Sequence, residues 1–127
     1  PSGDLRDVKE AAEAGRERAR VAIDVFVAAI RKFIGQFLVE MNGADILVFT
    51  AGIAEHNPDL RAAICSDLGF CGLELDPAAN DATLANEAVI SGPQSKIEVR
   101  VIPTNEEIVI ARNAWRKLSE IENQRDN

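Results

Sequence analysis

Apolar residues recur every three or four positions over residues 19–38, a spacing that aligns them along one face of an α-helix. The stripe contains three of the five phenylalanines in the chain and covers about 30 Å of helix. Its members are Ala19, Ala22, Ile23, Phe26, Val27, Ile30, Phe33, Ile34, Phe37 and Leu38. The sequence MNG at residues 41–43 ends the pattern. Such a stripe is typical of a helix that packs on a core or at a subunit interface, and not of a cofactor site.

Two apolar segments after this helix are predicted to be strands. Residues 46–50, ILVFT, are continuously apolar and rich in β-branched side chains, as in a buried parallel strand. Residues 96–102, KIEVRVI, alternate and then run apolar. Because strands alternate with helices along the chain, we predict an α/β fold in which a layered sheet is flanked by helices. Residues 46–50 and 97–102 are expected to pair in parallel.

Shorter helices are predicted on both sides of the first strand. Residues 5–14 form one of them, with Ser2 or Asp4 as the N-cap. Residues 58–68 form the other, with Asn57 as the cap.

The C-terminal half combines short elements with one longer helix. Residues 73–75 and 89–90 are predicted to be short strands, with a loop or a short helix between them. Residues 105–120 are predicted to be helical, and residues 122–127 to form a frayed end.

The charge and the aromatic content argue against nucleic-acid binding. The chain carries 21 acidic and 14 basic residues, a net charge of −7, with one Trp and no Tyr. A protein that binds a phosphate backbone needs a basic face, and a protein that binds single strands needs aromatic stacking platforms. No nucleic-acid partner is therefore expected.

The cysteines and the length of the apolar runs favour a cytoplasmic protein. Cys65 and Cys71 fit neither a CxxC redox motif nor a zinc pair, and His56 is the only histidine. Both cysteines lie in an apolar stretch, so buried free thiols are expected. The chain has no signal peptide and no apolar run near the roughly 18 residues that a bilayer requires, so secretion and a membrane span are not predicted.

Two polar loops follow the predicted strands, where ligands bind in open α/β sheets. In FTAGIAEH, residues 49–56, Gly52 allows the backbone to approach a ligand. A plain strand–helix turn explains the same residues, and the pattern alone favours that interpretation. In IPTNEE, residues 102–107, Glu106 and Glu107 suit the first turn of a helix or an Mg²⁺ ion held through water. Capping is the interpretation that the pattern favours.

The remaining polar residues allow a binding role but indicate no catalytic one. Asp4 and Arg6 suit a helix cap and a surface pair, and an Arg guanidinium can also stack on a purine or hold a phosphate. His56 has no nucleophile or base beside it in the sequence, and no Ser/His/Asp or Cys/His arrangement is present.

Taken together, several segments resemble the C-terminal part of the acetate kinases and of their propionate- and butyrate-kinase relatives. These segments stand in the family's order and read SGDLRD, RKFIGQF, DILVFTAGIAEHNPDLRAAI, LGFCGLELD, VIS and SKIEVRVIPTNEEIVIAR. The resemblance implies an actin-like and Hsp70-like (RNase H-like) fold, with ATP bound between two α/β domains. It also implies transfer of the γ-phosphate to a short-chain carboxylate, which gives an acyl phosphate in a reversible reaction.

The resemblance assigns site residues motif by motif. Asp4, Leu5 and Arg6 correspond to residues beside the nucleotide. The family's GIGEN loop, which contacts adenosine, corresponds to GIAEH, which comprises Gly52, Ile53, Ala54, Glu55 and His56. Glu106 corresponds to the acid linked to Mg²⁺. Ala54 and His56 depart from the family pattern. The Cβ of Ala54 is expected at a position of close approach, where it would tighten or alter the adenine pocket and weaken nucleotide binding, or would be only a local variation.

The family's members are much longer than this chain, which begins at Pro1 and has its only methionine at Met41. We therefore expect residues 1–127 to be one C-terminal nucleotide-binding portion cut from a larger enzyme. The catalytic residues are expected in the missing part, so no catalytic residue is assigned here. The expected parent converts ATP and acetate to ADP and acetyl phosphate as a homodimer, and propionate or butyrate are alternative acceptors. The chain alone is expected to be inactive, or to be a non-catalytic module that associates with itself.

Overall fold

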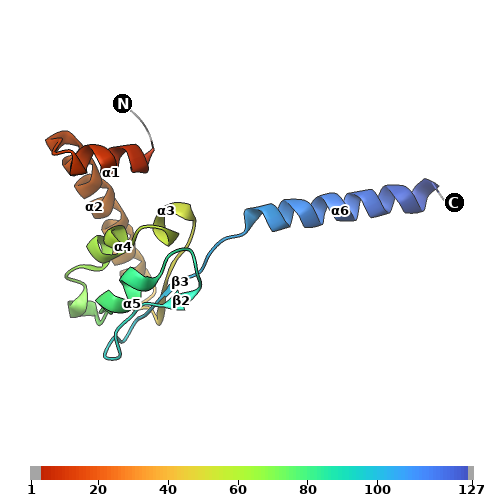
Figure 1. The fold of residues 1–127 in the computed structure, drawn as a ribbon. Helices are drawn as coiled ribbons and strands as arrows, with labels where there is room; N and C mark the ends of the chain where they lie inside the picture. The colour runs from red at the N-terminus through yellow and green to blue at the C-terminus, as the bar shows by residue number, and fades with distance from the viewer. Residues whose placement is uncertain (1–3, 126–127) are drawn as a thin grey trace.

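The computed structural model describes residues 4–125, without the side chains of residues 106 and 120–125. The chain forms helices and short strands in alternation (Figure 1). In order, they are α1 (Leu5–Glu13), α2 (Glu17–Glu40), β1 (Ile46–Phe49), α3 (Gly52–Glu55), α4 (Pro58–Cys65), the 3₁₀ turn η1 (Gly69–Cys71), α5 (Pro77–Ala82), β2 (Ala88–Val89), β3 (Glu98–Val101) and α6 (Glu106–Arg125).

The three strands form a small sheet in the order β1-β3-β2. β1 and β3 are parallel, with Ile46 opposite Glu98 and Phe49 opposite Val101, and β2 is antiparallel to β3. The predicted parallel pairing and the α/β class are therefore confirmed. Because β1 and β3 run in the same direction, the loops that follow them lie at the same edge of the sheet.

The core lies between the sheet and the helices α2 and α4. Side chains on alternate positions of β3 face it, and Val99 and Val101 are fully buried. Ile64 from α4 and Ile90 next to β2 complete its centre. A parallel strand becomes buried in this way because its connecting helix packs back onto the sheet.

Helix α2 covers the core with only part of its apolar stripe. Val27, Ile30, Ile34 and Leu38 are half-buried and pack against the core, at positions three or four residues apart. The three phenylalanines of the stripe lie beside this row and stay 38–57% exposed. The predicted helix is confirmed, and its apolar face is wider than the core that it covers.

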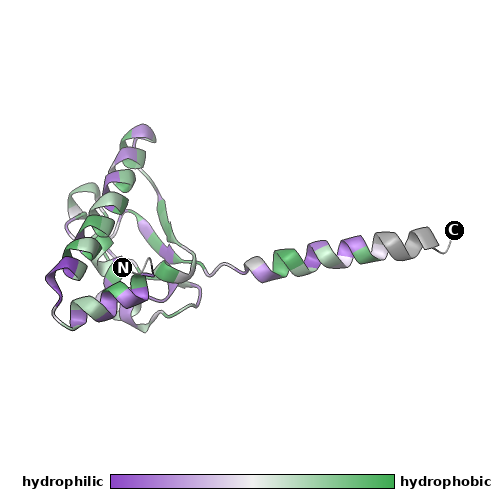
Figure 2. Ribbon diagram, turned by 90° about the horizontal axis from the view of Figure 1, so that it is seen from above, coloured by the Kyte–Doolittle hydropathy of each residue, from purple (hydrophilic) through white to green (hydrophobic). Residues whose placement is uncertain are grey.

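Helix α6 projects away from the rest of the molecule (Figures 1 and 2). Its apolar side chains are exposed: Ile108, Val109, Ile110, Trp115 and Leu118. The predicted helix over residues 105–120 is confirmed. The expected fraying is wrong for residues 122–125, which continue the helix because no glycine or proline interrupts it. Residues 126 and 127 lie outside the described range.

Two local expectations differ from the structure. The helix predicted over residues 58–68 ends at Cys65, because Ser66 is extended and Asp67 has a positive φ of 55°. Residues 73–75 form no strand, and only a single bridge joins Leu75 to Ser91.

Both cysteines are free, as expected, but only Cys65 is buried, while Cys71 is half-buried. Burial raises the pKa of the Cys65 thiol to about 12, so the thiol stays protonated at neutral pH. None of the described helices is long and apolar enough to cross a bilayer.

Candidate functional site

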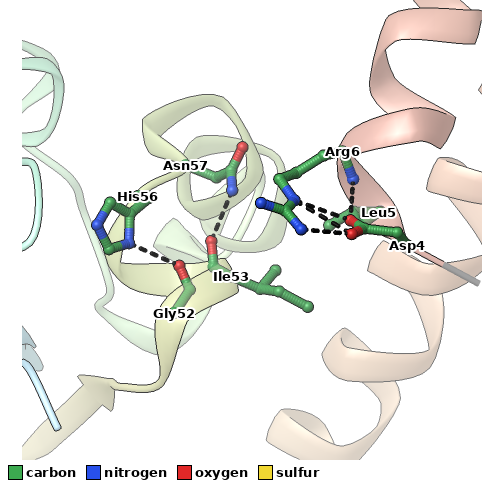
Figure 3. Close-up of a pocket in the computed structure, with 7 residues that line it drawn as sticks. All are labelled: Asp4, Leu5, Arg6, Gly52, Ile53, His56 and Asn57. Carbon is green, nitrogen blue, oxygen red and sulfur yellow. Dashed lines mark hydrogen bonds and ion pairs between the residues drawn. The ribbon is translucent and has the colours of Figure 1, made fainter. Parts of the chain in front are cut away.

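A cavity of about 780 Å³ lies between the start of α1 and the segment that follows β1 (Figure 3). Its lining residues are Asp4, Leu5, Arg6, Gly52, Ile53, His56 and Asn57. The fold thus brings together the two motifs that the resemblance assigns to a nucleotide, although they lie far apart in the chain. The cavity has the volume of a small-molecule site.

Asp4 and Arg6 form one wall of this cavity. Asp4 caps α1 by accepting a hydrogen bond from the backbone N–H of Arg6 at 2.9 Å. The Arg6 guanidinium donates to the same carboxylate through Nε at 3.1 Å and Nη2 at 2.6 Å. These bonds lower the pKa of Asp4 to about 2. The predicted cap and surface pair are both present, and Figure 3 shows the guanidinium between Asp4 and α3. Ser2, the alternative cap, lies outside the described residues.

The opposite wall begins where β1 ends. Ala51 has φ 67° and ψ 148°, a backbone conformation that residues with a Cβ rarely adopt, and it turns the chain sharply into α3. A Cβ added to Gly52 would meet no atom within 4 Å, so the backbone here is open to a ligand. The structure therefore offers the backbone access that the sequence predicts at Gly52.

Helix α3 is a single turn, and side chains supply hydrogen-bond donors to all four of its carbonyl oxygens. His56 Nδ1 lies 2.9 Å from the oxygen of Gly52, and Asn57 Nδ2 donates to the oxygen of Ile53 at 2.8 Å. Because a carbonyl oxygen only accepts, Nδ1 is the donor in this contact. Asn57 occupies the N-cap position of α4 but does not cap that helix, which corrects the expectation for this residue.

Arg61 provides the donors to the remaining two carbonyl oxygens of α3. Its Nη1 donates to Ala54 at 2.7 Å and to Glu55 at 3.0 Å. Its other N–H groups donate to the carbonyl oxygens of Asn80 and Thr83, at 2.8 and 2.7 Å, and to Oδ1 of Asn80 at 2.9 Å. The side chain is fully buried, and burial lowers its pKa from the usual arginine value. Arg61 thus fastens α3 to α5.

Sequence reasoning missed Arg61, although the sequence contains a signal. Leu60, Ile64 and Cys65 mark the buried face of α4, and Arg61 lies on that same face. An arginine at such a position must find several acceptors, because burying a charge without partners is costly.

The two departures from the family pattern have different surroundings. The methyl group of Ala54 packs against the core and is not among the groups that line the cavity, which favours a local variation. His56 does line the cavity, and its ring N–H donates to the carbonyl of Gly52. An asparagine amide has an N–H that can make the same kind of bond.

Glu55 does not line the first cavity, although the resemblance assigns it to the nucleotide. Its side chain is buried, and Oε1 accepts from the backbone N–H of Thr104 at 2.9 Å and from the Thr104 hydroxyl at 3.2 Å. Glu55 therefore joins the loops that follow β1 and β3.

A second cavity, of about 500 Å³, lies where these loops meet. Its lining residues are Ala51, Gly52, Glu55, Thr104, Asn105 and Glu107. Asn105 Oδ1 accepts from the backbone N–H of Ile108 at 3.0 Å, so it caps the start of α6. The side chain of Glu106, assigned to Mg²⁺ by the resemblance, lies outside the described part of the structure. Among the described side chains, no group of three His, Cys, Asp or Glu residues is placed to hold a metal ion.

The sequence model of a family described as "Acetokinase family" matches residues 1–112. The acetate kinase of Dictyoglomus turgidum is 49% identical over 119 residues, which cover 94% of this chain and 29% of that protein. The acetate kinase of Clostridioides difficile is 45% identical over 115 residues, which cover 91% of this chain and 29% of that protein. These matches confirm the resemblance inferred from the motifs.

Solved structures give the same result. The acetate kinase of Porphyromonas gingivalis superimposes with a TM-score of 0.81 at 38% identity, over 92% of this chain and 29% of that chain. A propionate kinase from Francisella tularensis gives a TM-score of 0.74 at 35% identity, over 85% of this chain and 27% of that chain. The chain thus spans less than a third of the length of these relatives.

Replacing Arg61 should destabilise the whole fold. We expect Arg61→Met to lower the free energy of unfolding by about 3–5 kcal/mol. The carbonyl oxygens of Ala54 and Thr83 lose their Arg61 donor, and those of Glu55 and Asn80 keep only a backbone N–H donor. Urea unfolding followed by circular dichroism measures the change. Arg20→Met, at an exposed position of α2, is the matched control and should stay within about 0.5 kcal/mol of the unchanged protein. Equal stability of the two variants would contradict the assigned role.

Proposed function

This chain belongs to the acetokinase family, and from that premise we propose that it is the nucleotide-side portion of a phosphotransferase whose acceptor is a carboxyl group. The proposed reaction converts ATP and acetate to ADP and acetyl phosphate and runs in both directions. Propionate and butyrate are the alternative acceptors, and a propionate kinase is among the structural relatives. The fold of the whole enzyme is proposed to be actin-like, with the nucleotide between two domains. The observation that supports the proposal is the convergence of Asp4–Arg6 with Gly52, Ile53 and His56 on one cavity.

The cavity provides the groups that a nucleotide needs. Leu5 and Ile53 give apolar contact area for a base. The Arg6 guanidinium, held by Asp4, offers a flat cationic face for stacking or a donor for a phosphate oxygen. The open backbone at Gly52 allows close approach. Glu55, which joins the two loops, is proposed to shape this site through Thr104 and not by touching the base.

Mg²⁺ is proposed to accompany the nucleotide at the loop that begins α6. Glu107 and Thr104 line the second cavity with a carboxylate and a hydroxyl, and such oxygen donors suit Mg²⁺, which keeps several waters and takes few protein ligands. Glu106 is the proposed metal-linked acid on the same loop. Bound there, the ion would neutralise phosphate charge on the nucleotide.

The first test is nucleotide binding by this chain. We expect calorimetric titration with ADP in Mg²⁺ buffer to show saturable binding, and Arg6→Ala to raise the Kd at least about tenfold, because the guanidinium is lost from the cavity wall. Arg20→Ala, an exposed arginine on α2, is the control and should bind as the unchanged chain does. No heat of binding, or equal affinity of the Arg6 and Arg20 variants, would contradict this site.

The second test is turnover in a hybrid enzyme. This chain would replace the matching segment of the Dictyoglomus turgidum acetate kinase. We expect the hybrid to form acetyl phosphate from ATP and acetate, trapped as the hydroxamate, because the rest of that enzyme supplies the acceptor side. The same hybrid with Arg6→Ala should show a lower kcat/KM for ATP. Cooperative unfolding would show that the hybrid is folded. A folded hybrid that releases no ADP with acetate, propionate or butyrate would contradict the proposed reaction.

We further propose that the protein is a homodimer formed through α2. Phe26, Phe33 and Phe37 are 38–57% exposed on one side of this helix, beside the row that packs on the core. An exposed apolar surface of this kind is typical of an interface, since water contact with it is unfavourable. This surface also supports the alternative in which the chain alone is a self-associating module without activity.

Sedimentation tests the dimer directly. We expect the unchanged chain to sediment as a dimer and Phe33→Glu to sediment as a monomer, because a buried, unpaired carboxylate is costly. Gln36→Glu, which adds the same charge at an exposed polar position of α2, should leave the dimer intact. A monomer for the unchanged chain at the highest concentration would exclude self-association through this face.

A further inference from the structure

The two walls of the first cavity belong to helices that are linked by an indirect packing route. α1 packs on α2, α2 packs on α4, and α4 packs on α3. Small shifts at each of these contacts would add up at the cavity, where α1 faces α3. A site that holds its ligand in one geometry therefore gains from a direct connection between the walls.

Lys9 and Asn57 make such a connection. Lys9 lies one helical turn after Leu5, so both side chains lie on the same face of α1. Its ammonium group donates to Asn57 Oδ1 at 2.9 Å, and Nδ2 of the same amide donates to the carbonyl oxygen of Ile53 at 2.8 Å. The Asn57 amide therefore connects α1 by hydrogen bonds to Ile53 in α3, which forms the opposite wall.

The surroundings of Lys9 make this bond stronger than a surface contact. The Lys9 side chain is 28% exposed, and its partner Asn57 is half-buried. A hydrogen bond from a charged donor is stronger than one between neutral groups, particularly when water is partly excluded. The second contact of Lys9, with Asp59 at 3.4 Å, involves a carboxylate that is 86% exposed, so it contributes little.

We propose that Lys9 and Asn57 are positioning residues of the nucleotide site, and this inference rests on the proposed function above. Their hydrogen bonds hold the α1 and α3 walls at the separation that accepts the ligand. We call these two hydrogen bonds, Lys9 to Asn57 and Asn57 to Ile53, the bridge. Without the bridge the walls also adopt separations that do not accept the ligand, and the apparent affinity falls in proportion to the time spent at those separations. Neither residue needs to contact the reacting phosphate for this effect.

The test compares variants of Lys9 in this chain. We expect Lys9→Met, which keeps the length of the side chain, to raise the Kd for ADP about fivefold, whereas Lys9→Arg restores most of the affinity. Lys32→Met makes the same change at an exposed position of α2 and should not alter the Kd. In Lys9→Met combined with Asn57→Ala, the two effects should not add, because both changes break one bridge. Thermal unfolding midpoints measured in parallel separate positioning from loss of fold.

Three results would overturn the proposal. They are an unchanged Kd in Lys9→Met, a loss of affinity that Lys9→Arg does not restore, and additive effects of the two substitutions. Amide hydrogen exchange makes the test independent of nucleotide binding. If the unchanged chain binds no ADP, the proposed nucleotide site is wrong. The exchange rates of the backbone amides of Ala54, Glu55 and His56 then test whether the bridge holds α3 in place. Faster exchange in Lys9→Met than in Lys32→Met supports it, and equal exchange excludes it.

Discussion

The carbonyl oxygens of α3 are the constraint on which the candidate site depends. A helix of one turn has no following helical residues to donate to its last carbonyl oxygens. The oxygens of Gly52 and Glu55 also accept from the backbone N–H groups of His56 and Ala85. Those of Ile53 and Ala54 accept from side chains, and an unpaired buried acceptor costs about 1–3 kcal/mol. His56, Asn57 and Arg61 remove that cost by donating to these oxygens. Side chains outside the turn at the end of β1 therefore complete its hydrogen bonds.

The same contacts make α3 the junction between the other elements. The Arg61 side chain connects α3 by hydrogen bonds to the C-terminal end of α5, and the Glu55 carboxylate connects α3 to Thr104 in the loop before α6. Asn57 leads to Lys9 in α1. Arg61, Glu55 and Asn57 thus connect α3 to three other parts of the chain. The cavity at α1 and the cavity at the second loop share α3 as their common wall, through Gly52.

The sequence predicted those parts of the fold that depend on local patterns. The parallel pairing of β1 with β3 followed from two apolar segments separated by helices, and the strand-end position of the loops followed from that pairing. The Arg61 contacts with Asn80 and Thr83, and the contact of Lys9 with Asn57, join residues 19, 22 and 48 positions apart. No periodicity in the sequence encodes such contacts. Glu55 shows a related difficulty, because its motif identifies the loop but not the direction in which its side chain points.

The placement of residues 52–57 separates two kinds of role within one short segment. Gly52, Ile53, His56 and Asn57 line the first cavity, whereas Ala54 packs against the core and the buried side chain of Glu55 bonds to Thr104 beside the second cavity. Ala54 and Glu55 thus contribute contacts within the protein, and the other four residues form part of the cavity surface. An alanine at residue 54 is compatible with the site for this reason, since its methyl group adds to the core. The histidine at residue 56 combines both roles, because one ring nitrogen completes the turn while the ring itself forms part of the cavity wall.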